Sequence, residues 1–229
     1  MLRKIAVSFL VVAVFACFNS ATAQINLGVK GGINLSHLWG AEEEGGVDPY
    51  EHQVMLPGAV AGVYAEIVAA PMFAIQPEVL FSMKGTKVSD DDESVLRANY
   101  LEIPLLLKLR IPVGPVTPSV YTGVAAGFLL GVGGYEEFNG ERHDFTDEDK
   151  EEIKDMMKSF DLGLPMGVAL DIDVGPISIV ADVRYTLGLT IIPELTDDMK
   201  DLGVTEDDLG DHRNGALSIM AGIAIPFGM

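Results

Sequence analysis

The sequence is poor in cysteine and in basic residues, and each scarcity excludes a class of protein. The 229 residues contain a single cysteine, which rules out a disulfide scaffold or a zinc site built from several cysteines. Only 15 lysine and arginine residues stand against 34 aspartate and glutamate residues, so the formal charge is −19. Such a chain lacks the basic surface of a general nucleic-acid binder. It also lacks a P-loop, a dinucleotide fingerprint and a haem motif, and we predict no cofactor and no metal.

What the sequence does contain is apolar residues and glycine. Hydrophobic residues make up 48% of the chain and the mean hydropathy is +0.30. The chain is therefore too apolar to be disordered by charge repulsion. Its 25 glycines are many, and glycine is unfavourable inside helices.

Residues 1–23 have the pattern of a cleaved secretory signal peptide. Two basic residues precede an apolar run over residues 5–18. Ala21 and Ala23 then provide the small residues of a cleavage site, which leaves Gln24 as the new N-terminus. We predict that residues 24–229 form a single domain.

Two alternatives to this cleavage remain open. A retained anchor helix is disfavoured, because the run is shorter than the about 20 residues of a spanning helix. Lipoprotein processing at Cys17 is the other, although Phe15 fits such a motif poorly.

After residue 24, apolar and polar residues alternate with the two-residue period of β-strands. Between Tyr100 and Ile111, the odd-numbered positions are all leucine or isoleucine, whereas Glu102 and Lys108 occupy even-numbered ones. Two apolar stretches could be mistaken for helical spans, but both alternate and are interrupted by glycine, proline or glutamate. We predict eight strands, at about residues 25–37, 56–69, 72–86, 100–111, 118–131, 160–172, 177–190 and 215–227.

Short and long connections alternate strictly along the chain. The short ones, rich in proline and glycine, are at residues 70–71, 112–115 and 173–176. The long ones are at about 38–55, 87–98, 132–159 and 191–214. This rhythm predicts an all-β fold, an eight-stranded antiparallel up-and-down transmembrane β-barrel. Short periplasmic turns and long extracellular loops are typical of outer-membrane barrels.

The composition of the two strand faces distinguishes a membrane barrel from a soluble, lipocalin-like one. One face is an almost continuous set of aliphatic residues, which suits lipid. The other combines ionic residues with glycine, alanine and serine, which suits the crowded lumen of an eight-stranded barrel. We therefore favour the membrane barrel.

The inward face carries charges of both signs in nearly equal number, and buried charges need partners. Centring the hairpin on residues 92–93 predicts that Lys84 lies near Glu102 and Glu78 near Lys108. We predict a lumen closed by its own side chains, with a small-solute channel as the alternative. The predicted ionic network comprises Lys30, Glu66, Glu78, Lys84, Glu102, Lys108, Arg110, Asp161, Asp171, Asp182 and Arg184.

Five segments resemble the PorT-like outer-membrane β-barrel family of Bacteroidetes-type bacteria. They are GGINLS at 31–36, QPEVLFSMKG at 76–85, YLEIPLLLK at 100–108, KSFDLG at 158–163 and RYTLGL at 184–189. The resemblance implies an outer-membrane barrel without established catalytic residues, and its naming member is tied to protein secretion. Phe227 resembles the terminal aromatic residue favoured by the barrel-assembly machinery, although two residues follow it.

The long loops hold most of the acidic residues. We interpret them as a solvated, repulsive fringe, with weak cation bridging to lipopolysaccharide. A specific calcium site is a weaker alternative, because no loop has the EF-hand spacing. Within the loops, Thr146 followed by three acidic residues predicts the start of a helix, and Thr196 and Thr205 predict two more.

The four histidines, His37, His52, His143 and His212, fall in or near the long loops. An outer-membrane hydrolase could use them with acidic residues at the extracellular mouth. Ser36 beside His37 is the only suggestive pair, and no nucleophile motif is present. We therefore predict that the protein is not an enzyme.

The prediction as a whole is a non-enzymatic envelope or interaction protein, with a role as an accessory to secretion implied by the resemblance. We expect a monomer in contact with outer-membrane lipid and lipopolysaccharide. The expected protein partners are the barrel-assembly machinery during biogenesis and an envelope or secretion protein.

Overall fold

The computed structural model describes residues 24–39, 53–89, 93–138, 141–193 and 212–227. The predicted signal peptide, its cleavage site before Gln24 and Cys17 lie outside this part. Eight long strands make up most of it: β1 (Gln24–Trp39), β3 (Leu56–Ala70), β4 (Phe73–Ser89), β5 (Glu93–Arg110), β6 (Val116–Phe138), β8 (Phe160–Val174), β9 (Ile177–Gly188) and β10 (Arg213–Phe227). Two short strands, β2 (Gln53–Val54) and β7 (Glu141–Asp144), pair with β4 and β6.

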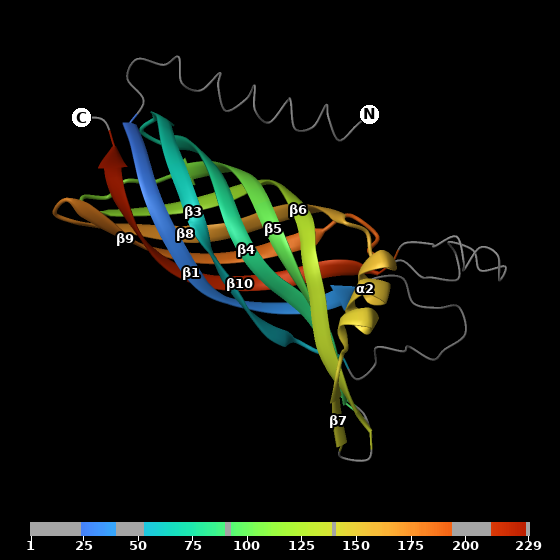
Figure 1. Ribbon diagram of the computed structural model, residues 1–229. Helices are drawn as coiled ribbons and strands as arrows, with labels where there is room; N and C mark the ends of the chain where they lie inside the picture. Colours follow the sequence, from blue (N-terminus) through green and yellow to red (C-terminus); the bar gives the residue numbers. More distant parts are fainter. Residues whose placement is uncertain (1–23, 40–52, 90–92, 139–140, 194–211, 228–229) are drawn as a thin grey trace, which may run out of the picture.

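The eight long strands close on themselves as an antiparallel barrel (Figure 1). Each strand pairs with the next long strand along the chain, and β1 pairs with β10 from Ile25↔Phe227 to Trp39↔Arg213. Closure leaves no unpaired edge along this wall, which is the condition for a sheet that spans hydrocarbon. The predicted up-and-down barrel is confirmed.

The two ends of the barrel differ. The three short connections, at residues 71–72, 111–115 and 175–176, lie at one end, which we call the turn end. Gly114 and Gly175 adopt φ values of 61° and 68° there, a left-handed conformation that glycine tolerates best. Helix α2 (Asp147–Asp155) and β7 lie at the opposite end, which we call the mouth end (Figure 1).

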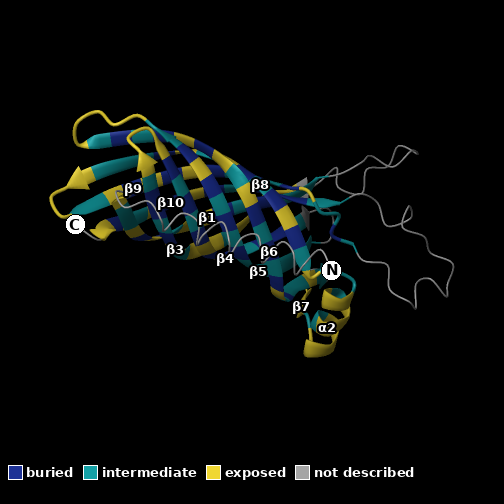
Figure 2. Cartoon of the chain, turned by 90° about the horizontal axis from the view of Figure 1, so that it is seen from above, coloured by how far each residue is buried: buried dark blue, intermediate teal, exposed yellow. Residues whose placement is uncertain are grey.

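Burial alternates along every long strand (Figure 2). In β1 the side chains of Val29 and Ile33 are 57% and 51% exposed, whereas Lys30 between them is buried. In β5, Leu107 is 60% exposed and Lys108 is buried. The outward face is therefore aliphatic and the inward face polar, the arrangement of a barrel that faces lipid rather than water.

The predicted long loop at 87–98 is wrong. Strand β4 continues to Ser89 and β5 starts at Glu93, with Lys87 paired to Val95 in the ladder. An ion pair of 2.5 Å between Lys87 and Glu93 supports this extended hairpin, and the phenol of Tyr135 on β6 donates to Glu93. Cross-strand contacts of this kind stabilise a hairpin even where both faces are polar.

The predicted helix after Thr146 is confirmed as α2. Thr146 is its N-cap and forms a capping box with Asp149: the Asp149 backbone N–H donates to Thr146 Oγ1, and the Thr146 N–H donates to the Asp149 carboxylate. The helix starts predicted at Thr196 and Thr205 lie outside the described residues. In the part of the chain that is described, no helix is long and apolar enough to cross a membrane.

Candidate functional site

The inward charges gather in three clusters along the lumen. Nine of the eleven predicted network residues are buried, and the other two, Arg110 and Asp171, are half-buried near the turn end. Strand alternation alone places them there, because every one occupies an inward position of its strand.

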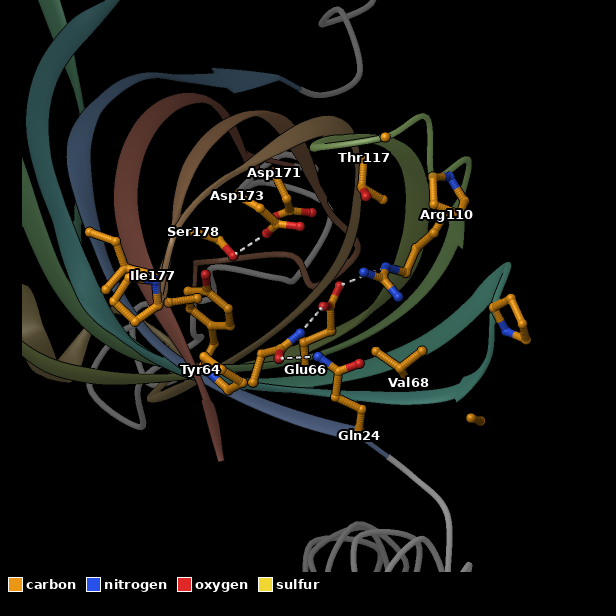
Figure 3. Close-up of a pocket in the computed structure, with 18 of the residues that line it drawn as sticks. Gln24, Tyr64, Glu66, Val68, Arg110, Thr117, Asp171, Asp173, Ile177 and Ser178 are labelled. Carbon is orange, nitrogen blue, oxygen red and sulfur yellow. Dashed lines mark hydrogen bonds and ion pairs between the residues drawn. The ribbon is translucent and has the colours of Figure 1, made fainter. Parts of the chain in front are cut away.

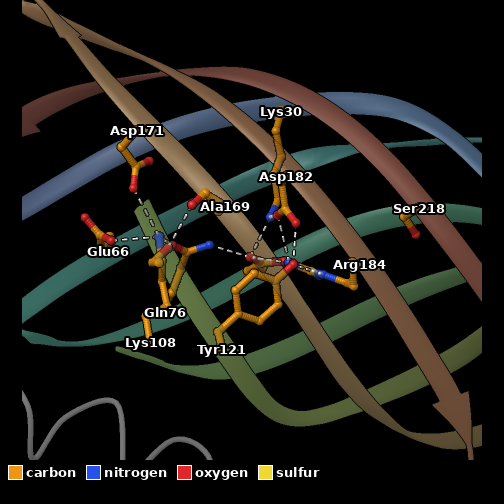
Figure 4. Close-up of polar contacts among 12 residues, drawn as sticks. Lys30, Glu66, Gln76, Lys108, Tyr121, Ala169, Asp171, Asp182, Arg184 and Ser218 are labelled. Atoms are coloured by element: carbon orange, nitrogen blue, oxygen red, sulfur yellow. Dashed lines mark hydrogen bonds and ion pairs between the residues drawn. The ribbon is translucent and has the colours of Figure 1, made fainter. Parts of the chain in front are cut away.

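The central cluster consists of Lys30, Glu78, Tyr121, Asp182 and Arg184. Figure 4 labels Lys30, Tyr121, Asp182 and Arg184. Lys30 Nζ lies 2.7 Å from both Glu78 Oε1 and Asp182 Oδ2. The Arg184 guanidinium forms a two-point contact with Glu78, at 2.8 and 3.0 Å, and also reaches Asp182 at 3.2 Å. The Tyr121 hydroxyl donates to Asp182 and accepts from Arg184 Nε at 3.1 Å. Every charge in this cluster is thus paired and hydrogen-bonded, as burial demands.

This cluster crosses the lumen. Arg184 is on β9 and Glu78 is on β4, which is four strands from β9 in either direction around the barrel. Lys30 from β1 and Tyr121 from β6 join from the two intervening arcs of the wall. Side chains from opposite walls therefore meet at the barrel axis.

The turn-side cluster consists of Glu66, Lys108, Arg110 and Asp171. Lys108 Nζ lies 2.8 Å from Glu66 Oε1 and 3.6 Å from Asp171 Oδ2, and Arg110 Nε lies 3.5 Å from Glu66 Oε1. Gln76 links this cluster to the central one, since it accepts from Lys108 at 3.0 Å and donates to Glu78 at 2.6 Å (Figure 4).

The mouth-side cluster consists of Lys84, Tyr100, Glu102, Asp161 and Asn214. Lys84 Nζ lies 2.6 Å from Glu102 Oε1, 3.6 Å from Asp161 Oδ2 and 5.3 Å from the centre of the Tyr100 ring. The Asn214 amide donates to Asp161 Oδ2 at 2.9 Å. The cluster carries one lysine and two carboxylates.

Of the two predicted ion pairs, one forms and one does not. Lys84 and Glu102 meet, but Glu78 pairs with Lys30 and Arg184 whereas Lys108 pairs with Glu66. The register of the β4–β5 hairpin differs from the predicted one for both pairs: Lys84 lies opposite Ala98, yet its side chain still reaches Glu102. The ladder pairs Ser89 with Glu93 and is centred on residue 91, so Lys108 lies opposite Ala74 rather than Glu78.

Sequence reasoning missed the uncharged members of these clusters. Gln76, Tyr121 and Asn214 connect charged groups, and Asn34 joins Ser82 and Ser218 through hydrogen bonds of 2.8 and 2.6 Å. All of these residues occupy inward positions of their strands, alternating with the aliphatic residues of the outward face. That alternation was the signal that could have identified them.

Helix α2 packs over the mouth-side end of the lumen. Its Ile153, together with Met157 just after it, contacts a buried apolar cluster of Ala98, Tyr100, Leu129 and Val132. Met157 also forms an isolated β-bridge with Pro193. An apolar lid therefore lies above the mouth-side charges.

The predicted pair of Ser36 and His37 does not come together in the structure. Ser36 is buried on the inward face of β1, and its hydroxyl lies 3.2 and 2.9 Å from the backbone carbonyls of Leu56 and Gly85. The next residue, His37, lies on the other face, with its ring 6.3 Å from the Tyr185 ring. His52 lies outside the described residues. Among those that are described, no group of three or more His, Cys, Asp and Glu side chains is arranged to hold a metal ion.

Comparison with known proteins agrees with this architecture. The family model described as "Outer membrane protein beta-barrel domain" matches residues 15–192, which is more than half of the chain. The chain belongs to this family. It is therefore an outer-membrane protein, and in such barrels the short turns face the periplasm and the mouth end faces the exterior.

Solved structures support the same fold. The outer membrane protein OprG from Pseudomonas aeruginosa has a TM-score of 0.51 at 12% identity, covering 91% of this chain and 98% of that one. A major outer membrane protein from Thermus thermophilus has a TM-score of 0.50 at 16% identity, covering 90% and 100%. At these identities the likeness concerns the fold alone. No curated protein sequence matches the chain.

Proposed function

We propose that this protein is a non-enzymatic outer-membrane barrel with a lumen filled by its own side chains, which acts as an envelope interaction protein. The observation that carries the proposal is the central cluster, in which Arg184 and Glu78 join opposite walls of the barrel. Conduction through this cross-section would require separating buried ion pairs, which costs several kcal/mol for each charge left unpaired.

The mouth end is the surface through which the protein acts. Helix α2 presents the acidic residues Asp147, Glu148, Glu151 and Glu152 to solvent at this end. The PorT-like resemblance supports an accessory role in secretion, with an envelope protein as the partner. The separation of Ser36 and His37 onto opposite faces of β1 supports a binding role over a hydrolytic one.

Two measurements test this proposal. In planar bilayers we expect the purified protein to show no defined unitary conductance, and a reproducible step would contradict the closed lumen. For the interaction role, a photo-cross-linker at Glu151 in intact cells should capture a defined envelope protein, identified by mass spectrometry. A cross-linker at Val183, which is on the lipid-facing wall, is the matched control. Identical products from both positions would contradict the interaction role.

A further inference from the structure

The turn end of the lumen contains a cavity of about 750 Å³ (Figure 3). Its lining includes residues of all three short turns, among them Pro71, Gly114 and Pro176, together with inward residues of β1, β3, β5 and β8. Cavities of about 300–1,000 Å³ are typical of small-molecule sites. Glu66, Arg110 and Asp171 of the turn-side cluster are among its lining residues.

A buried phenol without a partner borders this cavity. Tyr64 is 6% exposed, and its hydroxyl has no hydrogen-bond partner among the described residues. The ring lies across Gly28, where an added Cβ would approach the Tyr64 ring and hydroxyl to within 2.3–2.6 Å. Figure 3 shows the ring pointing toward the side of the cavity where Asp173 and Ser178 lie.

Tyr121, deeper in the lumen, is a buried phenol whose hydroxyl does form hydrogen bonds. It lies across Gly167 in the same way, but its hydroxyl contacts Asp182 and Arg184. A buried hydroxyl left without a partner is destabilising relative to a bonded one, because it has lost its water without gaining a hydrogen bond. The Tyr64 hydroxyl therefore keeps an unused hydrogen-bonding capacity beside the cavity.

The cavity has negatively charged side chains on one side, from β8, and a positively charged side chain on another, from β5. Asp171 and Asp173 project from β8, and Asp171 Oδ2 is buried without a hydrogen bond, 3.6 Å from Lys108. Arg110 projects from β5, and its Nε likewise lacks a hydrogen bond, 3.5 Å from Glu66. Figure 3 shows Asp171 and Arg110 on different sides of the cavity.

We propose that this cavity is a periplasm-facing binding site for a small zwitterionic molecule, one that carries both an ammonium group and a carboxylate. The ammonium donates to Asp171 and to the Tyr64 hydroxyl, and the carboxylate accepts from Arg110. A metal ion does not suit the cavity, since no group of side chains arranged to hold one occurs among the described residues. The site is blind, because the central cluster closes the lumen beyond it. It therefore goes beyond the proposed function without requiring transport.

Short peptides are suitable probes, because their two charges can be removed one at a time. The experiment is calorimetry on residues 24–229 refolded in an uncharged detergent, titrated with trialanine. The comparison ligands are N-acetyl-trialanine, which lacks the ammonium, and trialanine amide, which lacks the carboxylate. We expect trialanine to bind, and each analogue to bind about tenfold to a hundredfold more weakly.

Variants assign each charge of the ligand to a side chain. Arg110→Gln should weaken trialanine binding to the level of the amide, and leave binding of the amide unchanged. Asp171→Asn should weaken trialanine binding to the level of the acetylated peptide, and leave binding of the acetylated peptide unchanged. Tyr64→Phe should weaken trialanine and the amide, both of which carry the ammonium. Lys87→Gln, at the mouth end, is the control and should change nothing.

Three results would overturn the proposal. They are the absence of binding heat with trialanine at millimolar concentration, equal binding of all three peptides, and equal weakening of all three by Arg110→Gln. If Arg110→Gln does not fold, as judged by heat-modifiable electrophoretic mobility, Arg110→Lys replaces it. That variant keeps the charge and should retain discrimination between trialanine and its amide.

Discussion

The mouth end and the turn end of the lumen are built from the same strands, but one is covered and the other contains a cavity. At the mouth, Ile153 and Met157 cover the charges with apolar contacts, and Lys84 reaches two carboxylates. At the turn end no lid is present in the described residues. Tyr64, Arg110 and Asp171 keep polar atoms without hydrogen bonds there, against Asp161 Oδ1 in the mouth-side cluster. Strand parity therefore places polar groups inside the barrel. Whether they fill the lumen or leave a cavity depends on the distances between side chains of opposite charge.

The central cluster separates these two regions, and its removal should have the largest effect. Glu78→Ala leaves Lys30 and Arg184 each short of a carboxylate inside the lumen. Breaking a buried pair by deleting one partner costs about 3–5 kcal/mol, and we expect a loss of that size in the free energy of unfolding. The measurement is urea unfolding in lipid vesicles.

The matched control is Asp173→Asn, whose carboxylate is exposed at the turn end and accepts from Ser178 at 2.6 Å. Its effect should stay within about 0.5 kcal/mol. Similar losses for Glu78→Ala and Asp173→Asn would mean that the central cluster does not hold the barrel together.

The two buried phenols test how much a hydrogen-bonded hydroxyl contributes to stability compared with one that lacks a partner. Tyr121→Phe removes a donor to Asp182, and a hydrogen bond to a charged group contributes about 1.5–3 kcal/mol. Tyr64→Phe removes a buried hydroxyl that has no partner in the described residues, so we expect the free energy of unfolding to stay unchanged or to rise slightly. Both changes keep the ring that lies over a glycine. Equal losses in the same unfolding measurement would show that the Tyr64 hydroxyl is also bonded.

The lid at the mouth should contribute less than the ionic clusters. Ile153→Ala removes half-buried apolar surface from the contact with Leu129 and Val132, at a cost of about 1 kcal/mol. Amide hydrogen exchange in α2 should become faster, while planar-bilayer conductance should remain absent, because the central cluster still crosses the lumen. A conductance step in Ile153→Ala alone would show that the lid, and not the central cluster, closes the barrel.

The sequence predicted the wall of the barrel and the inward position of its charges well, because both follow from local parity. Leu107 and Lys108 are adjacent, and their opposite burial needs no knowledge of any other strand. The ion pairs were harder to predict. A shift of the hairpin centre from residues 92–93 to residue 91 was enough to give Lys108 a partner other than Glu78. Register depends on contacts between strands, which a single-sequence pattern does not contain.

The cavity could not be predicted for the same reason. Tyr64, Arg110 and Asp171 lie on β3, β5 and β8, and only closure of the barrel brings them around one space. Nothing in the local sequence distinguishes the Tyr64 phenol from that of Tyr121, which is satisfied. The difference lies in whether a carboxylate from a distant strand lies within reach.

The smallest expected effect concerns pH at the mouth end, where α2 begins. Hydrogen bonds from the Thr146 side chain and backbone to Asp149 hold the pKa of this carboxyl below its ordinary value. The folded pKa is depressed, so this contribution to helix stability is present above the unfolded pKa, near 4, and is lost as the pH falls through the folded pKa. Amide exchange in α2, corrected for its intrinsic pH dependence, should accelerate below about pH 4. Asp149→Asn should abolish this step, whereas Glu148→Gln, which removes an acid outside the capping box, should preserve it. A step that survives in Asp149→Asn would show that a group outside the capping box causes the pH dependence.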